Sequence, residues 1–182
     1  MPIVFVEKTR CAISNKIITD SDYVMGFYAF PYYEPPHPLS VCYDNVALRD
    51  EFNKWEFREE VTEELSKIWT QRYGKSDAYQ TVIFKDDSYI IAKGTIDANV
   101  RIWFLKHIFT LTVSKVDWKA FCQTLLDDQK EISFDLHKDS HLLVRKENEG
   151  VKIYYDRLRD RIKLDFLEWH YFLSILAMNQ NL

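Results

Sequence analysis

The sequence has few of the residues that build disulfide frameworks, phosphate loops or membrane spans. Its three cysteines, Cys11, Cys42 and Cys122, are odd in number, far apart and in no metal-ligand spacing, which favours a reducing compartment. Only four glycines occur, and they form no glycine-rich phosphate loop. The longest apolar runs are far shorter than a bilayer span, and the N-terminus lacks the basic-then-apolar order of a secretory signal. We therefore expect a nuclear or cytoplasmic protein without a membrane segment.

Patterns of catalytic and metal-binding residues are also missing. No Ser-His-Asp or Cys-His signature can be assembled from local context. His137 and His141 lie four apart in the sequence, but the expected loop-to-strand context gives them no common helical face and no third ligand. We therefore predict no enzyme activity, no cofactor and no metal site.

The charge is unevenly distributed along the 182 residues. Residues 1–78 contain 9 Lys and Arg against 13 Asp and Glu, a balance of −4, whereas residues 79–182 contain 15 of each. The overall charge of −4 argues against a simple electrostatic binder of nucleic acid. Aromatic residues make up 15% of the chain, more than a small core requires, so some are expected on a binding surface.

The N-terminal region, residues 1–78, predicts short strands, an irregular loop and one long helix. All five prolines fall between Pro2 and Pro38, so residues 30–40 must be extended or turn-like. Residues 45–74 contain apolar side chains at three-to-four spacing, no proline, and Gly74 as a stop. We expect this long amphipathic helix to pack against the rest of the protein or to mediate assembly, as a homo-oligomer or with a protein partner.

An internal repeat organises the remainder of the chain. Residues 100–121 align without a gap on residues 151–172, which indicates one supersecondary unit used twice. Each unit, 79–130 and 131–182, is predicted as strand, hairpin, strand, strand and helix. Gly150 suits the hairpin turn of the second unit, and the aligned Asn99 tolerates the same left-handed backbone. The predicted class is therefore α+β, with two antiparallel sheet-plus-helix units in tandem.

The junction between strand and helix carries the same signals in both copies. Ser114 aligns with Asp165 as a predicted N-cap, and Asp117 aligns with Glu168 at the third position beyond it, which completes a capping-box pattern. Trp118 and Trp169 occupy the matching hydrophobic-staple position. Each helix then carries an apolar stripe, and we expect the two stripes to meet across a pseudo-two-fold axis.

The middle strands of the two units predict one buried and one free sheet face. Val100, Ile102 and Phe104 alternate with Arg101 and Trp103, and the second copy repeats this pattern with Val151, Ile153 and Tyr155 against Lys152 and Tyr154. Basic side chains interleaved with aromatic rings are what a single-stranded nucleic-acid platform needs. Cross-strand pairing on an exposed sheet produces the same composition without any ligand.

The unit resembles the positive-cofactor-four family of single-stranded-DNA-binding transcriptional coactivators. The similarity covers residues 141–173 most closely, with "IKLDFLEW" its most specific part, whereas "LTVSKVDW" in the first copy is a weaker match. A tandem pair in one chain is also similar to the related Whirly fold. The first copy departs by having no basic residues on its third strand, and residues 1–78 match nothing in the family.

The resemblance implies a sequence-tolerant binder of single-stranded DNA, with RNA as an alternative ligand, acting in transcription or replication. The residues predicted to contact nucleic acid are Arg101, Trp103, Lys106, Arg145, Lys146, Lys152, Tyr154, Arg157, Arg161 and Lys163. The alternative is a structural or protein-interaction protein, including one of viral origin, that keeps the fold and uses the same faces for protein partners. Acidic net charge favours the alternative, whereas the matched basic and aromatic positions favour nucleic acid.

Overall fold

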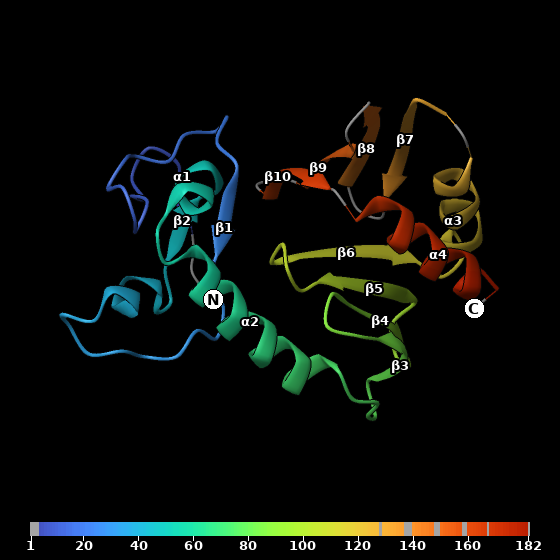
Figure 1. The fold of residues 1–182 in the computed structure, drawn as a ribbon, viewed down its shortest axis with the longest axis horizontal. Helices are drawn as coiled ribbons and strands as arrows, with labels where there is room; N and C mark the ends of the chain where they lie inside the picture. Colours follow the sequence, from blue (N-terminus) through green and yellow to red (C-terminus); the bar gives the residue numbers. More distant parts are fainter. Residues whose placement is uncertain are drawn as a thin grey trace.

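The computed structural model describes residues 4–127, 129–136, 140–147, 150–157, 160–166 and 168–181, with the backbone alone for 140, 147, 150, 156–157 and 160–166. Over these residues the chain forms four α-helices and three antiparallel sheets (Figure 1), which confirms the predicted α+β class. No helix within the described ranges has the length and apolarity that crossing a membrane requires.

The first part of the chain folds around short elements and an aromatic core. β1 (Val24–Gly26) pairs antiparallel with β2 (Val46–Leu48), and a 3-10 helix, Pro38–Cys42, lies between them in the sequence. The rings of Phe27 and Phe52 lie 5.8 Å apart in this core, which also holds Cys11 and Cys42. The strands are too short for backbone pairing alone to hold this region together. Burial of these aromatic and thiol side chains supplies the remaining stabilisation.

The long helix predicted over residues 45–74 is wrong in its first half. Residues 46–48 belong to β2, α1 (Arg49–Lys54) is short, and α2 (Arg58–Tyr73) begins only after a break. At the break the backbone of Trp55 is extended and its ring lies edge-on to Phe57 at 5.5 Å. Both helices face the same core through Phe52, Val61 and Leu65, so the apolar spacing continues across the break and conceals it.

Two four-stranded antiparallel sheets follow, each with its strands in sequence order and each followed by a helix. The first consists of β3 (Gln80–Lys85), β4 (Tyr89–Gly94), β5 (Asn99–Phe104) and β6 (Phe109–Ser114), followed by α3 (Trp118–Leu126). The second consists of β7 (Glu131–Leu136), β8 (Ser140–Glu147), β9 (Gly150–Arg157) and β10 (Asp160–Phe166), followed by α4 (Trp169–Asn179). Counterparts begin at one constant offset in residue number throughout, at 80 and 131, 89 and 140, 99 and 150, 109 and 160, and 118 and 169.

The helices begin later than the predicted caps. Ser114 is the last residue of β6 and Asp165 lies inside β10. The residues that directly precede α3 and α4 are Asp117 and Glu168, and neither makes a side-chain capping hydrogen bond. The backbone N–H of Asp117 donates to the Ser114 carbonyl at 3.1 Å and closes a turn between strand and helix. The predicted capping box and hydrophobic staple are therefore wrong. In the first copy a turn separates Ser114 from α3, and in the second copy β10 continues through Asp165 to Phe166.

The two sheets and helices α3 and α4 enclose one hydrophobic core. The residues predicted on the buried face of the middle strands are buried, namely Val100, Ile102, Phe104, Val151, Ile153 and Tyr155. The rings of Phe109 and Tyr155 lie 5.3 Å apart across the two sheets. The Trp118 indole N–H donates to the Asn179 carbonyl at 2.9 Å. The predicted contact between the two helices is thus confirmed, since both apolar stripes lie in this core.

Helix α2 covers the opposite, outer face of the first sheet (Figure 1). Ile90, Trp103 and Leu105 are buried there, with Trp69 and Tyr73 of α2 packed on them. The Ser66 hydroxyl donates to the Leu105 carbonyl at 2.8 Å. The N-terminal helix therefore packs against the sheets, which is one of the two roles predicted for it, and the first sheet is covered on both faces.

A buried arginine joins the N-terminal region to the first sheet. Arg49, the first residue of α1, donates from Nη1 to the His107 carbonyl at 2.8 Å and from Nη2 to the Ile108 carbonyl at 3.1 Å. Both carbonyls lie in the turn between β5 and β6, where Ile108 has a φ of 48°. Because a β-branched residue rarely adopts positive φ, the two charge-assisted hydrogen bonds help to hold this turn.

Candidate functional site

The predicted site residues of the first sheet are not free to form an open platform. Trp103 is only 4% exposed, and its ring stacks on Tyr73 of α2 with centroids 4.9 Å apart and planes 18° apart. Arg101 makes an ion pair with Asp97 and stays partly exposed. The prediction that Trp103 stacks on a base is therefore corrected, because α2 covers the face on which that ring lies.

Lys106 has an intramolecular partner that joins the two units. Its ammonium lies 2.8 Å from the carboxylate of Glu168, the residue before α4, and the Tyr89 hydroxyl donates to the same carboxylate at 3.4 Å. Burial and the neighbouring Glu168 raise the pKa of Tyr89 well above its usual range, so this hydroxyl keeps its proton. The structure therefore places Lys106 at a contact between the first sheet and the second helix.

The outer face of the second sheet carries three of the predicted residues together. Arg145 on β8 is opposite Lys152 on β9, and Tyr154 follows on the same face of β9. The Arg145 guanidinium carbon lies 5.5 Å from the centroid of the Tyr154 ring. None of the described side chains on this face is buried. Cations beside an accessible ring are the arrangement that the sequence predicts for a stacking platform.

Acidic side chains that the sequence analysis did not consider share this face. The Arg145 Nε donates to the Glu131 carboxylate at 2.7 Å, and this hydrogen bond raises the pKa of Arg145. Asp135 contacts the His141 Nδ1 at 2.8 Å. Both acids come from β7, whose alternation in "EISFDL" is the signal that could have placed them. The face is therefore mixed in charge rather than basic.

Lys146 does not lie with Arg145. It is the next residue along β8, and its ammonium donates to the Asp127 carbonyl at 2.7 Å, just beyond the end of α3. Alternation sends neighbouring strand residues to opposite faces. Lys146, which is also a predicted nucleic-acid contact, therefore lies apart from the face that carries Arg145.

The structure does not describe the side chains of the last three predicted contacts, Arg157, Arg161 and Lys163. His137 lies outside the described residues altogether. The backbone of the three predicted contacts is described. Lys163 on β10 pairs in register with Tyr154, and Arg161 pairs with Asp156. The backbone thus brings a lysine position directly beside the ring of the outer face.

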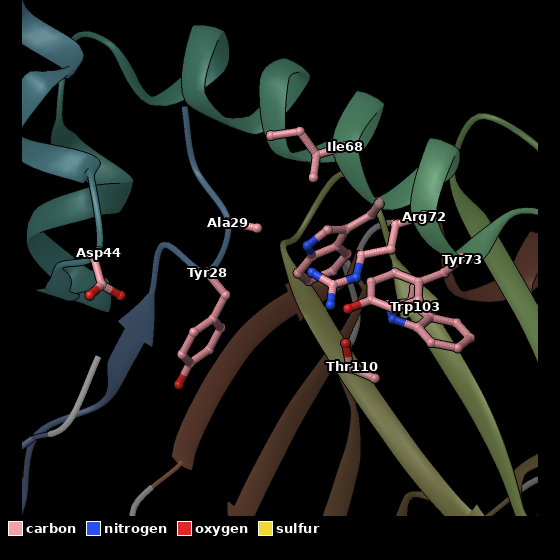
Figure 2. Close-up of a pocket in the computed structure, with 9 residues that line it drawn as sticks. Tyr28, Ala29, Asp44, Ile68, Arg72, Tyr73, Trp103 and Thr110 are labelled. Carbon is pink, nitrogen blue, oxygen red and sulfur yellow. The ribbon is translucent and has the colours of Figure 1, made fainter. Parts of the chain in front are cut away.

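A cavity of about 450 Å³ lies where the N-terminal region, α2 and the outer face of the first sheet meet (Figure 2). Aromatic, charged and hydroxyl side chains from all three parts line it, namely Tyr28, Ala29, Asp44, Ile68, Trp69, Arg72, Tyr73, Trp103 and Thr110. A smaller cavity of about 160 Å³ shares Tyr28, Trp69 and Thr110 and extends towards Arg49. Sequence reasoning missed this site.

Part of the signal for the cavity is local. Trp69, Arg72 and Tyr73 are at three-to-four spacing and share one face of α2. Tyr28 and Trp103 come from distant parts of the chain, so nothing in the sequence brings them to that face. Figure 2 shows the Arg72 side chain reaching into the cavity and Asp44 at the other end.

No set of three metal-ligating side chains occurs among the described residues. Comparison of the chain with protein-family models, with curated proteins and with solved structures finds no match. The assignment of function therefore depends on the geometry of these two places.

Proposed function

We propose that the protein binds single-stranded nucleic acid, most simply single-stranded DNA, on the outer face of the second sheet. The observation that supports this function is the partly exposed Tyr154 ring with the Arg145 guanidinium against it and Lys152 on the same strand and face. A base can stack on such a ring whatever its sequence, and the cations can contact the flanking phosphates.

We also propose that the two units are copies of one positive-cofactor-four-like or Whirly-like unit. The constant offset between all counterpart strands and helices supports a duplication, as does the contact between α3 and α4. The proposal departs from a symmetric platform, because α2 covers the equivalent face of the first copy.

The acids on the face set the expected strength of binding. Glu131 already accepts a hydrogen bond from Arg145, so phosphate has to compete for that guanidinium. Exposed ion pairs contribute little free energy, so competition is feasible at low salt. We therefore expect weak binding that decreases steeply as salt is added.

The location we propose is nuclear or cytoplasmic. Cys11, Cys42 and Cys122 are free thiols and all are buried. Burial raises the pKa of Cys42 and of Cys122 to about 12, so neither thiol is poised to react. Such cysteines suit a reducing compartment.

The test is anisotropy of a labelled oligothymidylate over a series of salt concentrations. Tyr154→Ala should lose about 1–3 kcal/mol of binding free energy with the salt slope unchanged, since a stacking contact is lost and no phosphate contact. Tyr79→Ala is the matched control, because that ring is 68% exposed but lies just before β3 rather than on this face.

A second pair of variants tests the charges with opposite signs. Arg145→Gln should weaken binding and make the salt slope shallower by about 0.7. Glu131→Gln should instead tighten binding, because it releases Arg145 for phosphate. A duplex of equal length should bind more weakly, since its bases are already stacked. If the wild-type protein does not bind single strands at low salt, the nucleic-acid proposal is wrong and the alternative, a protein-interaction surface, replaces it.

A further inference from the structure

We propose that the cavity between the N-terminal region, α2 and the first sheet binds a small anion that carries a planar aromatic ring, the chemical class to which a nucleoside monophosphate belongs. The cavity of about 450 Å³ is within the size range of small-molecule sites. The inference uses none of the residues of the proposed nucleic-acid face and stands independently of it.

The walls of the cavity are rings held in place before any ligand arrives. Tyr73 and Trp103 stack with planes 18° apart, and Trp103 is buried on the outer face of the first sheet. Trp69 and Tyr28 complete the aromatic lining. Rings prefer offset-stacked or edge-to-face neighbours, so a flat aromatic ligand fits these walls better than an aliphatic one of the same volume.

Arg72, a cation that lines the cavity, indicates that the ligand is negatively charged. The Arg72 guanidinium carbon lies 5.5 Å from the centroid of the Tyr73 ring, and Figure 2 shows the side chain directed into the cavity. Among the residues that the structure describes, no carboxylate makes an ion pair with Arg72. A guanidinium that lies over a ring presents its donors as a planar fork, which suits phosphate or carboxylate.

The other polar groups orient the ligand. Thr110 lines the cavity from β6, and Asp44 lies at the end away from Arg72 (Figure 2). A carboxylate accepts N–H or O–H donors and repels a second anionic group. We therefore expect the anionic group of the ligand beside Arg72 and any ring donor at the end where Asp44 lies.

Calorimetric titration with three probes separates the contribution of the ring from that of the charge. Adenosine 5′-monophosphate carries both an aromatic base and an anionic phosphate. Adenosine lacks the phosphate, and ribose 5-phosphate lacks the aromatic base. The monophosphate should bind at least about tenfold more tightly than either of the other two probes, because charge-assisted hydrogen bonds and stacking each contribute to its affinity. 2-Naphthoate serves as a smaller planar anion and should also bind.

Variants then assign the binding to this cavity. Arg72→Gln should weaken monophosphate binding roughly tenfold to a hundredfold, the range for loss of hydrogen bonds to a charged group, while adenosine is unaffected. Lys67→Gln is the matched control on the same helix, since Lys67 is exposed and pairs with Glu64. Thr110→Phe should abolish binding of every probe by filling the cavity, and a thermal melt checks that it folds.

The two proposals fail separately. Tyr154→Ala should leave monophosphate binding unchanged, and Arg72→Gln should leave oligothymidylate binding unchanged. The cavity proposal is overturned if neither the monophosphate nor 2-naphthoate binds at millimolar concentration. It is equally overturned if adenosine and the monophosphate bind alike, or if folded Thr110→Phe binds as well as the wild type.

Discussion

Replacement of Arg49 by methionine tests how the N-terminal region is attached to the first sheet. Arg49 is 3% exposed, and its two hydrogen bonds to the His107 and Ile108 carbonyls help to hold the β5–β6 turn. Methionine has similar length and removes the charge and both donors. The hydrogen bond to the Ile108 carbonyl is buried and the one to the His107 carbonyl is partly buried, and a buried carbonyl that loses its partner costs about 1–3 kcal/mol.

A gain partly offsets this loss. Burial lowers the pKa of Arg49 to about 10, which shows that the folded state carries a desolvation cost for this cation. Methionine relieves that cost. We therefore expect a net destabilisation of about 2–4 kcal/mol, close to the range seen when one partner of a buried charged contact is removed.

The assay is urea unfolding followed by tryptophan fluorescence, with a thermal melt as a second measurement. For a chain of this size 1 kcal/mol corresponds to about 2–4 °C in Tm. Arg10→Met is the matched control, because Arg10 also donates to a backbone carbonyl, that of Asn15, but at an exposed site. Its effect should stay within about 0.5 kcal/mol. A loss below about 1 kcal/mol for Arg49→Met would refute the reasoning, since the turn would then hold without its donors.

Three further outcomes follow from single contacts. Lys106→Gln should cost no more than about 1 kcal/mol, because its ion pair with Glu168 is exposed; a larger loss in urea unfolding would show that the pair holds the units together. Burial lowers the pKa of His107 to about 4, below its value in the unfolded chain. The stability that the neutral imidazole contributes is therefore complete above about pH 6.5 and is lost as the pH falls towards 4. His107→Gln should show a smaller decrease in unfolding free energy over that pH range than the wild type does. Trp118→Phe should lose about 0.5–1.5 kcal/mol for the hydrogen bond to the Asn179 carbonyl, in addition to the packing lost, and an unchanged urea midpoint would contradict this.

The sequence predicted what depends on local alternation. The buried positions of β5 and β9, Val100 and Val151 among them, follow from a period of two. The repeat was visible because every counterpart element begins at the same offset, so the two copies align without a gap. The caps failed because Ser114 suits either a strand end or an N-cap, and only strand pairing decides between these.

In the first copy the predicted binding face is covered, and no local sequence pattern indicates this coverage. Trp103 and Tyr154 occupy equivalent positions of β5 and β9, and both alternate with buried residues. What distinguishes them is Tyr73, which reaches Trp103 from another part of the chain. Periodicity separates the two faces of a strand but does not say which face another element will cover.

The coverage of one copy makes the outer faces of the two sheets different. An isolated sheet-plus-helix unit leaves one face uncovered, and the same sequence pattern in both copies would make two similar faces. The N-terminal region removes this equivalence, because α2 buries Trp103 and Leu105 and Arg49 holds the adjoining turn. The covered face gains a cavity at its border with α2, whereas the second face keeps Tyr154 accessible. Replacing apolar residues of α2 that contact the sheet should therefore loosen the cavity while the second face keeps its structure.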